Sequence, residues 1–141
     1  MVTHFRELRV YRRGMDVAMQ LFELSKGWPK EERYALTDQA RRSSRAVCAN
    51  VAEAWGKRRY PRHFVSKLTD ADAEARETQA WIEIAVRCGY IERDAFYELD
   101  DACEVVIGSL VKMMQQPDPW CGPSALTREP ERPYYICDPG Q

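Results

Sequence analysis

The sequence has few histidines and no long apolar run. Its two histidines, His4 and His63, do not follow a glutamate by three positions, so the Glu-x-x-His pairs of di-metal helical bundles are missing. No glycine-rich phosphate loop or zinc-type cysteine spacing is present. No apolar stretch approaches the roughly 20 residues of a membrane span, and the charged N-terminal segment lacks the apolar centre of a signal peptide. We therefore expect a cytoplasmic protein with no cofactor, no metal and no membrane contact.

The cysteines do not indicate a disulfide framework. There are five, an odd number, and no two form a Cys-x-x-Cys pair. Several occupy apolar helical positions, where cysteine behaves as a small hydrophobic residue. A nucleophilic pair of Cys48 with His63 has no local sequence support. The sequence therefore predicts free thiols and no enzymatic activity.

Neither positive nor negative charge dominates the composition, yet the charged residues are unevenly distributed along the chain. The formal net charge is −1, but residues 1–67 carry a balance of +8 and residues 68–141 a balance of −9. A near-neutral chain is not a globally basic nucleic-acid binder. The two parts either pair with each other, within or between subunits, or each meets a partner of opposite charge.

Apolar residues at spacings of three and four predict four helices. Their expected ranges are about 9–25, 37–57, 61–88 and 94–116, with 30–36 as a helical turn or ordered loop. Thr37 and Asp94 are the expected N-caps of the second and fourth helices, and Gly89 is the expected residue after the third. Short connections predict an all-α, up-down antiparallel four-helix bundle.

The chain divides into a bundle, residues 1–116, and a proline-rich tail, residues 117–141. Six of the eight prolines fall in the tail, which has no helical or strand period. We expect an extended or disordered segment. Its aromatic residues Trp120, Tyr134 and Tyr135 either dock on the bundle or stay free, and the sequence favours neither.

The segment 39–60 is expected to form the central helix, because small residues recur along it at helical spacing. Asn50 and Glu53 share one face of this helix, and Glu77 lies among small residues of the next. A buried carboxylate needs partners, and the arginines of the central helix are candidates. We interpret Asn50, Glu53 and Glu77 as a structural polar network rather than a catalytic site.

Basic residues form the candidate binding surface. In an antiparallel bundle, the start of the first helix and the end of the second lie at the same end. Cations there suit the phosphates of nucleic acid or an acidic face of the next subunit. The candidates are Arg12, Arg13, Arg41, Arg42, Arg45, Lys57, Arg58, Arg59 and Arg62.

The segments QARRSSRAVCANVAEAWGKRR and FVSKLTDADAEARETQAWIEIAVRCGYI resemble bacterial four-helix bundle proteins of the ribosomal-RNA intervening-sequence type. The resemblance covers about residues 5–115, and Ala54 and Ala73 depart from the glycines common in that family. It implies a ring-like homopentamer with no known catalytic activity. Related proteins are accessory factors of diversity-generating retroelements, which bind a reverse transcriptase and nucleic acid.

Two hypotheses follow from the sequence. The first is a non-enzymatic homo-oligomer that binds RNA or DNA. The resemblance implies that this oligomer is a pentamer and that it acts as a reverse-transcriptase accessory protein. The second is a structural or protein-interaction oligomer with no nucleic-acid role. In the second, the same cations pair across subunits with Asp70, Asp72, Asp100 and Asp101.

Overall fold

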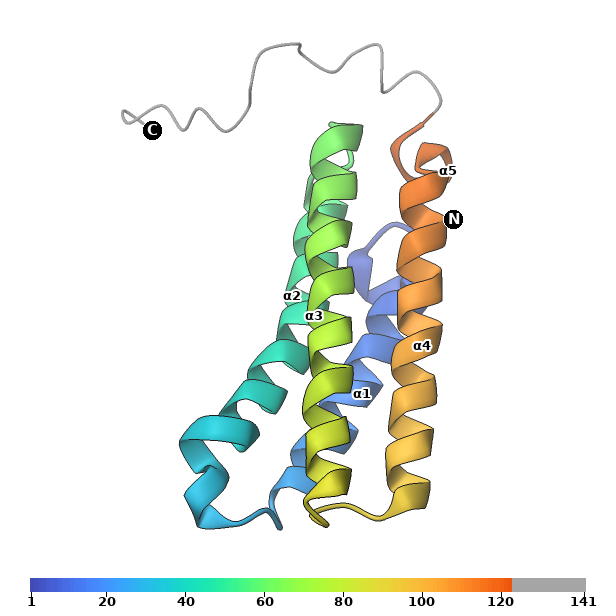
Figure 1. Ribbon diagram of the computed structural model, residues 1–141. Coiled ribbons are helices and arrows are strands. Elements are labelled where there is room, and N and C mark those ends of the chain that lie inside the picture. The colour runs from blue at the N-terminus through green and yellow to red at the C-terminus, as the bar shows by residue number, and fades with distance from the viewer. Residues whose placement is uncertain (123–141) are drawn as a thin grey trace, which may run out of the picture.

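The computed structural model describes residues 1–122, and four long helices account for most of them. These are α1 (Arg9–Ser25), α2 (Asp38–Gly56), α3 (Pro61–Arg87) and α4 (Arg93–Gln115). They run alternately up and down, so the predicted antiparallel four-helix bundle is confirmed (Figure 1). Within residues 1–122, no helix has the length and hydropathy needed to cross a bilayer.

Four short elements complete the described chain: η1 (Phe5–Glu7), η2 (Lys30–Glu32), η3 (Arg33–Thr37) and α5 (Asp118–Cys121). The helical turn expected at 30–36 is therefore present as η2 and η3. The η3 segment is a wide helical turn that leads into α2 without a break. Its Leu36 is buried in the core beside Trp28 and Ala40, which ties this turn to the bundle.

Both predicted N-caps are wrong. Thr37 has helical backbone angles, is buried and makes no capping hydrogen bond, because η3 already supplies the preceding helical turn. The extended residue before α4 is Glu92, so α4 begins two residues earlier than an N-cap at Asp94 allows. Gly89 is as predicted, with φ of +79° after the end of α3. The amides of Gly89 and Tyr90 bond the carbonyls of Val86 and Ala85 at 3.0 and 2.9 Å, closing the helix end.

The start of the predicted tail is ordered rather than extended. Residues 118–121 form the turn α5, in which Cys121 is buried. Trp120 packs against the apolar cluster that contains Phe64, Leu110 and Met113, so of the alternatives that the sequence left open, docking on the bundle holds for this residue. Tyr134, Tyr135 and the rest of 123–141 lie outside the described residues.

The core follows the seam between α2 and its neighbours. The side chains of Ala40, Ser43, Ser44 and Ala54 are almost fully buried. Ser43 Oγ and Thr78 Oγ1 are 2.8 Å apart across the seam of α2 and α3. Each hydroxyl also lies within hydrogen-bond distance of a carbonyl of its own helix, Ser43 near Ala40 and Thr78 near Glu74. Because a hydroxyl has one proton, one of the two donates across the seam and the other donates to its own helix, so neither is left unpaired.

Gly14 marks the closest contact of α1 with α2. A Cβ placed at Gly14 would lie 3.4 Å from Cys48 Sγ and 3.5 Å from Val47 Cγ1. Those are ordinary contact distances, so one methyl group fits and a larger side chain does not.

We expect Gly14→Ala to raise the free energy of unfolding by up to about 1 kcal/mol, through helix propensity. Gly14→Leu should lower it by about 1–3 kcal/mol, because extra methylenes overpack the contact. Urea unfolding followed by circular dichroism measures both. Gly108→Ala is the control, since a Cβ there meets nothing within 4 Å. Equal destabilisation by Gly14→Ala and Gly14→Leu would contradict the spacing described here.

Candidate nucleic-acid interface

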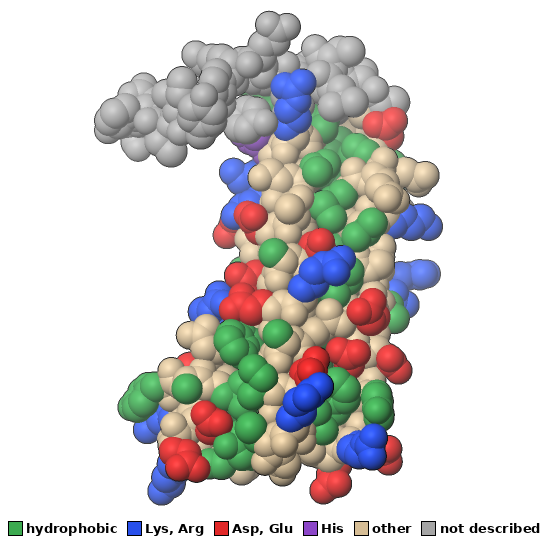
Figure 2. All heavy atoms as spheres, in the orientation of Figure 1, with side chains coloured by type: hydrophobic (Ala, Val, Ile, Leu, Met, Phe, Trp, Pro, Cys, Tyr) green, Lys and Arg blue, Asp and Glu red, His purple; other side chains and the backbone are tan. Residues whose placement is uncertain are grey.

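Cations gather at the end of the bundle where α1 and α3 begin and α2 and α4 end (Figure 1). The alternating helix directions bring these four termini together. We call this group the basic end; its members are Arg9, Arg12, Arg13, Lys57, Arg58, Arg59, Arg62 and Lys112. Figure 2 shows Lys and Arg side chains along both edges of the upper half of the molecule. Among the described residues near these termini, the carboxylates are Glu7, Glu53 and Asp118, and Glu53 contacts Lys67.

Most of the basic end is not neutralised by carboxylates of the same chain. Within residues 1–122, Arg9, Arg13, Lys57, Arg59 and Lys112 make no ion pair. Lys57 and Arg59 are exposed, and Arg59 lies 5.8 Å from the ring centre of Tyr60. We therefore expect mobile counterions to neutralise these cations, and phosphates can displace the counterions.

Two members of the basic end are fixed by their own chain. The guanidinium of Arg58 lies 3.4 Å from the ring centre of Trp55, and its Nε donates to the Trp55 carbonyl at 2.8 Å. Arg12 Nε donates to the carbonyl of Arg6 at 3.0 Å. Arg58 therefore covers the end of α2 as well as carrying charge, and its replacement would disturb packing.

The other three predicted binding residues lie in the opposite half of the bundle. Arg41, Arg42 and Arg45 are at the start of α2, and Arg45 is about 18 Å from Lys57 along the helix axis. Arg41 and Arg45 lie over the ring of Phe22, at 4.8 and 5.8 Å from its centre. The nine predicted residues therefore do not form one surface. Six of them belong to the basic end.

Arg42 is held by acidic residues of α3. Its Nη2 lies 2.8 Å from Glu77 Oε1 and its Nη1 lies 3.3 Å from Glu74 Oε1. The hydrogen bonds that Arg42 donates to Glu77 and, to a smaller extent, to Glu74 raise the pKa of Arg42 above its ordinary value. One of the expected arginine partners of Glu77 is thus present. Within the described part of the chain, Arg42 serves the α2–α3 contact.

The predicted polar network is present in a different form. Lys67 Nζ lies 2.7 Å from Glu53 Oε2 and 3.3 Å from Asn50 Oδ1, so it joins these two residues. Glu77 belongs to the separate Arg42 cluster. The side chain of Glu53 is 53% exposed and that of Glu77 34% exposed, so the expectation of buried carboxylates is wrong. Small side chains fill the seam, and the charged groups flank it, where each ion pair contributes about 0–1 kcal/mol.

Sequence reasoning missed Lys112 as a member of the basic end. It lies in the last turn of α4, and its place beside Arg9 and Arg13 depends on how α4 meets α1. The only local signal was a cation near a helix C-terminus, which the helix dipole alone explains. The tertiary arrangement was needed to bring these three residues together.

Comparison with known proteins places the fold in one family. A crystal structure from Bacteroides thetaiotaomicron, described as a protein with unknown function from the S23 ribosomal protein family, is similar to this chain. The two share 25% sequence identity with a TM-score of 0.68, over 76% of this chain and 99% of the other. Among curated proteins, none matches this chain.

The family model described as 23S rRNA-intervening sequence protein matches residues 6–112. This range contains all of α1, α2 and α3 and most of α4, and it agrees with the resemblance found in the sequence. Trp120 and α5 lie beyond it. The chain belongs to the 23S rRNA-intervening sequence protein family.

Proposed function

We propose that this protein is a non-enzymatic homo-oligomer that binds nucleic acid through its basic end. The observation that carries the proposal is the set of five cations there without ion-pair partners in residues 1–122. Elsewhere on the bundle, cations of both kinds occur within residues 1–122: Lys26, Arg42, Lys67, Arg76 and Arg87 contact carboxylates of the same chain, and Lys30, Arg33, Arg41, Arg45 and Arg93 make no ion pair. The basic end differs in that its unpaired cations gather at four neighbouring helix termini. A surface that keeps its cations unpaired suits a partner that brings the negative charge.

The acidic residues favour nucleic acid over a purely structural use of these cations. Asp70 contacts Lys67, Asp72 contacts Arg76, and Asp100 accepts a hydrogen bond from Gln79, all within one subunit. Three of the four acids that the structural hypothesis requires for contacts between subunits are therefore already engaged. This leaves fewer carboxylates to neutralise the basic end of a neighbour.

Unpartnered groups in the other half of the bundle support self-association. Trp81 Nε1 is buried and has no acceptor within residues 1–122. Apolar side chains gather over the lower part of the molecule, where η3 and α3 lie (Figure 2). Tyr34 there is 79% exposed and Ile84 is 42% exposed. Burying these groups against another subunit would remove apolar area from water and can give the indole an acceptor.

The proposal also includes a ring of five subunits and a reverse-transcriptase partner, and both rest on the family resemblance alone. The same holds for a cytoplasmic location, with which the free thiols of Cys48, Cys88 and Cys103 agree. The proposal includes no catalytic residue. Burial raises the pKa of the Cys48 thiol to about 11 and that of Cys103 to about 12, which disfavours the reactive thiolate.

Thiol labelling tests the inert character of these cysteines. At neutral pH we expect a maleimide to modify the exposed Cys88 quickly, while Cys48 and Cys103 react only after unfolding, because burial disfavours their thiolates. Peptide mass spectrometry over a time course measures each site. Modification of Cys48 as fast as Cys88 would reveal an activated thiol and contradict the non-enzymatic proposal.

Charge reversal tests the basic end. We expect Lys57→Glu with Arg59→Glu to weaken binding of structured RNA or duplex DNA by at least about tenfold at low salt. Removing two phosphate contacts should also lower the slope of log affinity against log salt by about two. Fluorescence anisotropy across a salt series measures both. We choose these residues rather than Arg58 because Arg58 also packs on Trp55.

The matched control is Lys30→Glu with Arg33→Glu, two exposed cations in η2 and η3 at the other end of the bundle. It changes the net charge equally and should leave affinity within about twofold if binding is local to the basic end. Light scattering reports the mass of each variant. Loss of assembly by the Lys57 and Arg59 variant, with no nucleic-acid binding by the unmodified protein, would favour the structural oligomer instead.

A further inference from the structure

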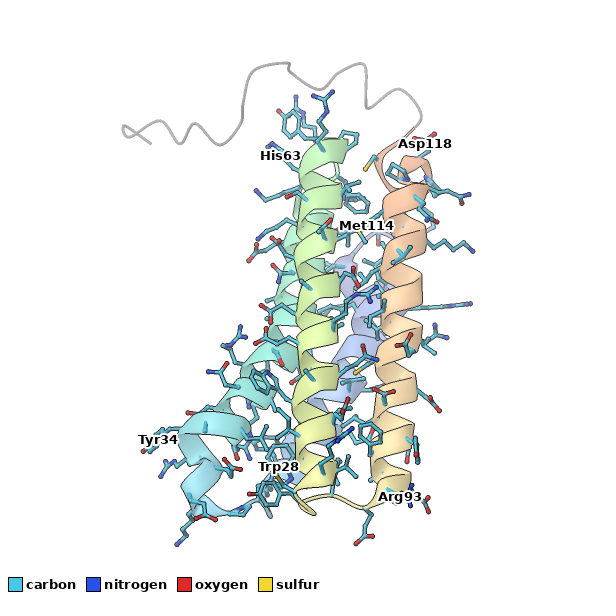
Figure 3. All side chains as sticks on the ribbon, in the orientation of Figure 1. Trp28, Tyr34, His63, Arg93, Met114 and Asp118 are labelled. Carbon is cyan, nitrogen blue, oxygen red and sulfur yellow. The ribbon has the colours of Figure 1, made fainter. Side chains whose placement is uncertain are left out.

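A groove runs along the basic end between the start of α1, the end of α4 and the turn α5. Its volume is about 460 Å³, within the usual range of ligand-binding sites. Three cations line it: Arg9 and Arg13 from α1 and Lys112 from α4. Figure 3 shows Met114 and Asp118 at this same end of the molecule.

The groove has unbalanced positive charge. Within residues 1–122, none of its three cations makes an ion pair or a hydrogen bond. Glu7 is the one acidic side chain among the lining residues, and both of its oxygens accept hydrogen bonds from Thr3, at 3.1 and 3.0 Å. These bonds keep the pKa of Glu7 below its ordinary value, so it stays ionised and leaves two cations in excess.

Ser109 and Gln116 are the neutral polar members of the lining, and its remaining residues are apolar and include Trp120. Val2, Leu8 and Met113 contribute to the floor, and Trp120 packs against the adjacent core. The amides of Trp120 and Cys121 both bond the carbonyl of Pro117 at 2.9 Å, which fixes the turn that carries the ring. A bare inorganic anion would use only the cations of such a groove. A paired duplex would offer its phosphates but no free base to the indole.

We propose that this groove holds an unpaired nucleotide of single-stranded nucleic acid, with its base against Trp120 and its phosphate among Arg9, Arg13 and Lys112. Cations along the backbone and an aromatic ring for the base are the two features that single-strand binders combine. This inference deepens the proposed function and rests on it for the nature of the partner. Arg9, Arg13 and Lys112 lie within the residues matched by the family model, whereas Trp120 lies outside them.

The test compares a short labelled oligouridylate with a blunt RNA duplex of equal length, using the full chain. We expect Trp120→Ala to weaken binding of the single strand by roughly 5- to 100-fold, as loss of one stacked base does, and to change duplex binding less than twofold. Trp120→Phe keeps a stacking ring and should remain within about threefold of the unmodified protein. Tyr97→Ala, which removes an exposed aromatic ring near the start of α4 at the other end, is the matched control and should change neither affinity.

Lys112→Glu provides a second variant that does not touch the core. Lys112 is exposed, so we expect normal folding together with a selective loss of single-strand affinity, whereas Lys30→Glu should have no effect. Equal loss of single-strand and duplex binding in the Lys112 and Trp120 variants would overturn the proposal. So would unchanged single-strand affinity in both variants, or a groove that takes up only a peptide of residues 123–141.

The two proposals can fail separately. If the protein binds a single strand but neither a duplex nor structured RNA, the proposal of a broader nucleic-acid surface fails and the proposal of a nucleotide in the groove stands. If duplex binding depends on Lys57 and Arg59, and neither Trp120→Ala nor Lys112→Glu has an effect, the groove proposal fails and the proposed role of the basic end stands.

Discussion

Close contact of α2 with both of its neighbours is the constraint on which the rest of this bundle depends. The contact is possible because Ala40, Ser44 and Ala54 of α2 are small and almost fully buried. Gly14 on α1 and Ala75 on α3 are the matching small residues on either side. Small residues bring helix axes close and leave little free volume, so larger side chains must lie elsewhere. The buried hydroxyls of this seam satisfy one another and their own helices, which avoids the cost of unpaired polar groups.

The tight seam also decides where the charges go. It has no space for carboxylates, so Glu53 and Glu77 lie on its flanks, where Lys67 and Arg42 reach them. These contacts neutralise part of the positive first half of the chain against the negative second half, inside one subunit. Within residues 1–122, five cations at the end of the bundle make no ion pair with a carboxylate. The uneven charge of the sequence is thus partly cancelled within the subunit and partly displayed at the basic end.

The helices and their order were predictable because apolar spacing reports directly which face of a helix is buried. Gly89 was predictable for the same local reason, since its φ is unfavourable for other residues. The helix caps were not predictable from the sequence, because Thr37 is preceded by a helical turn that depends on burial of Leu36. The groove was not predictable from the sequence either. Trp120 sits far in sequence from Arg9, and only the packing of α5 against the bundle brings them together.

In the function that we propose, assembly and nucleic-acid binding would be physically coupled. One basic end offers only a few phosphate contacts, and such a contact alone is weak and sensitive to salt. A closed oligomer repeats the same surface by symmetry, and a strand that spans two copies then binds the second at high effective concentration. Weakening the contacts between subunits would therefore lower affinity without altering any cation of the basic end. A loss of binding can be assigned to Lys57, Arg59 or Trp120 only when the mass of the oligomer is unchanged.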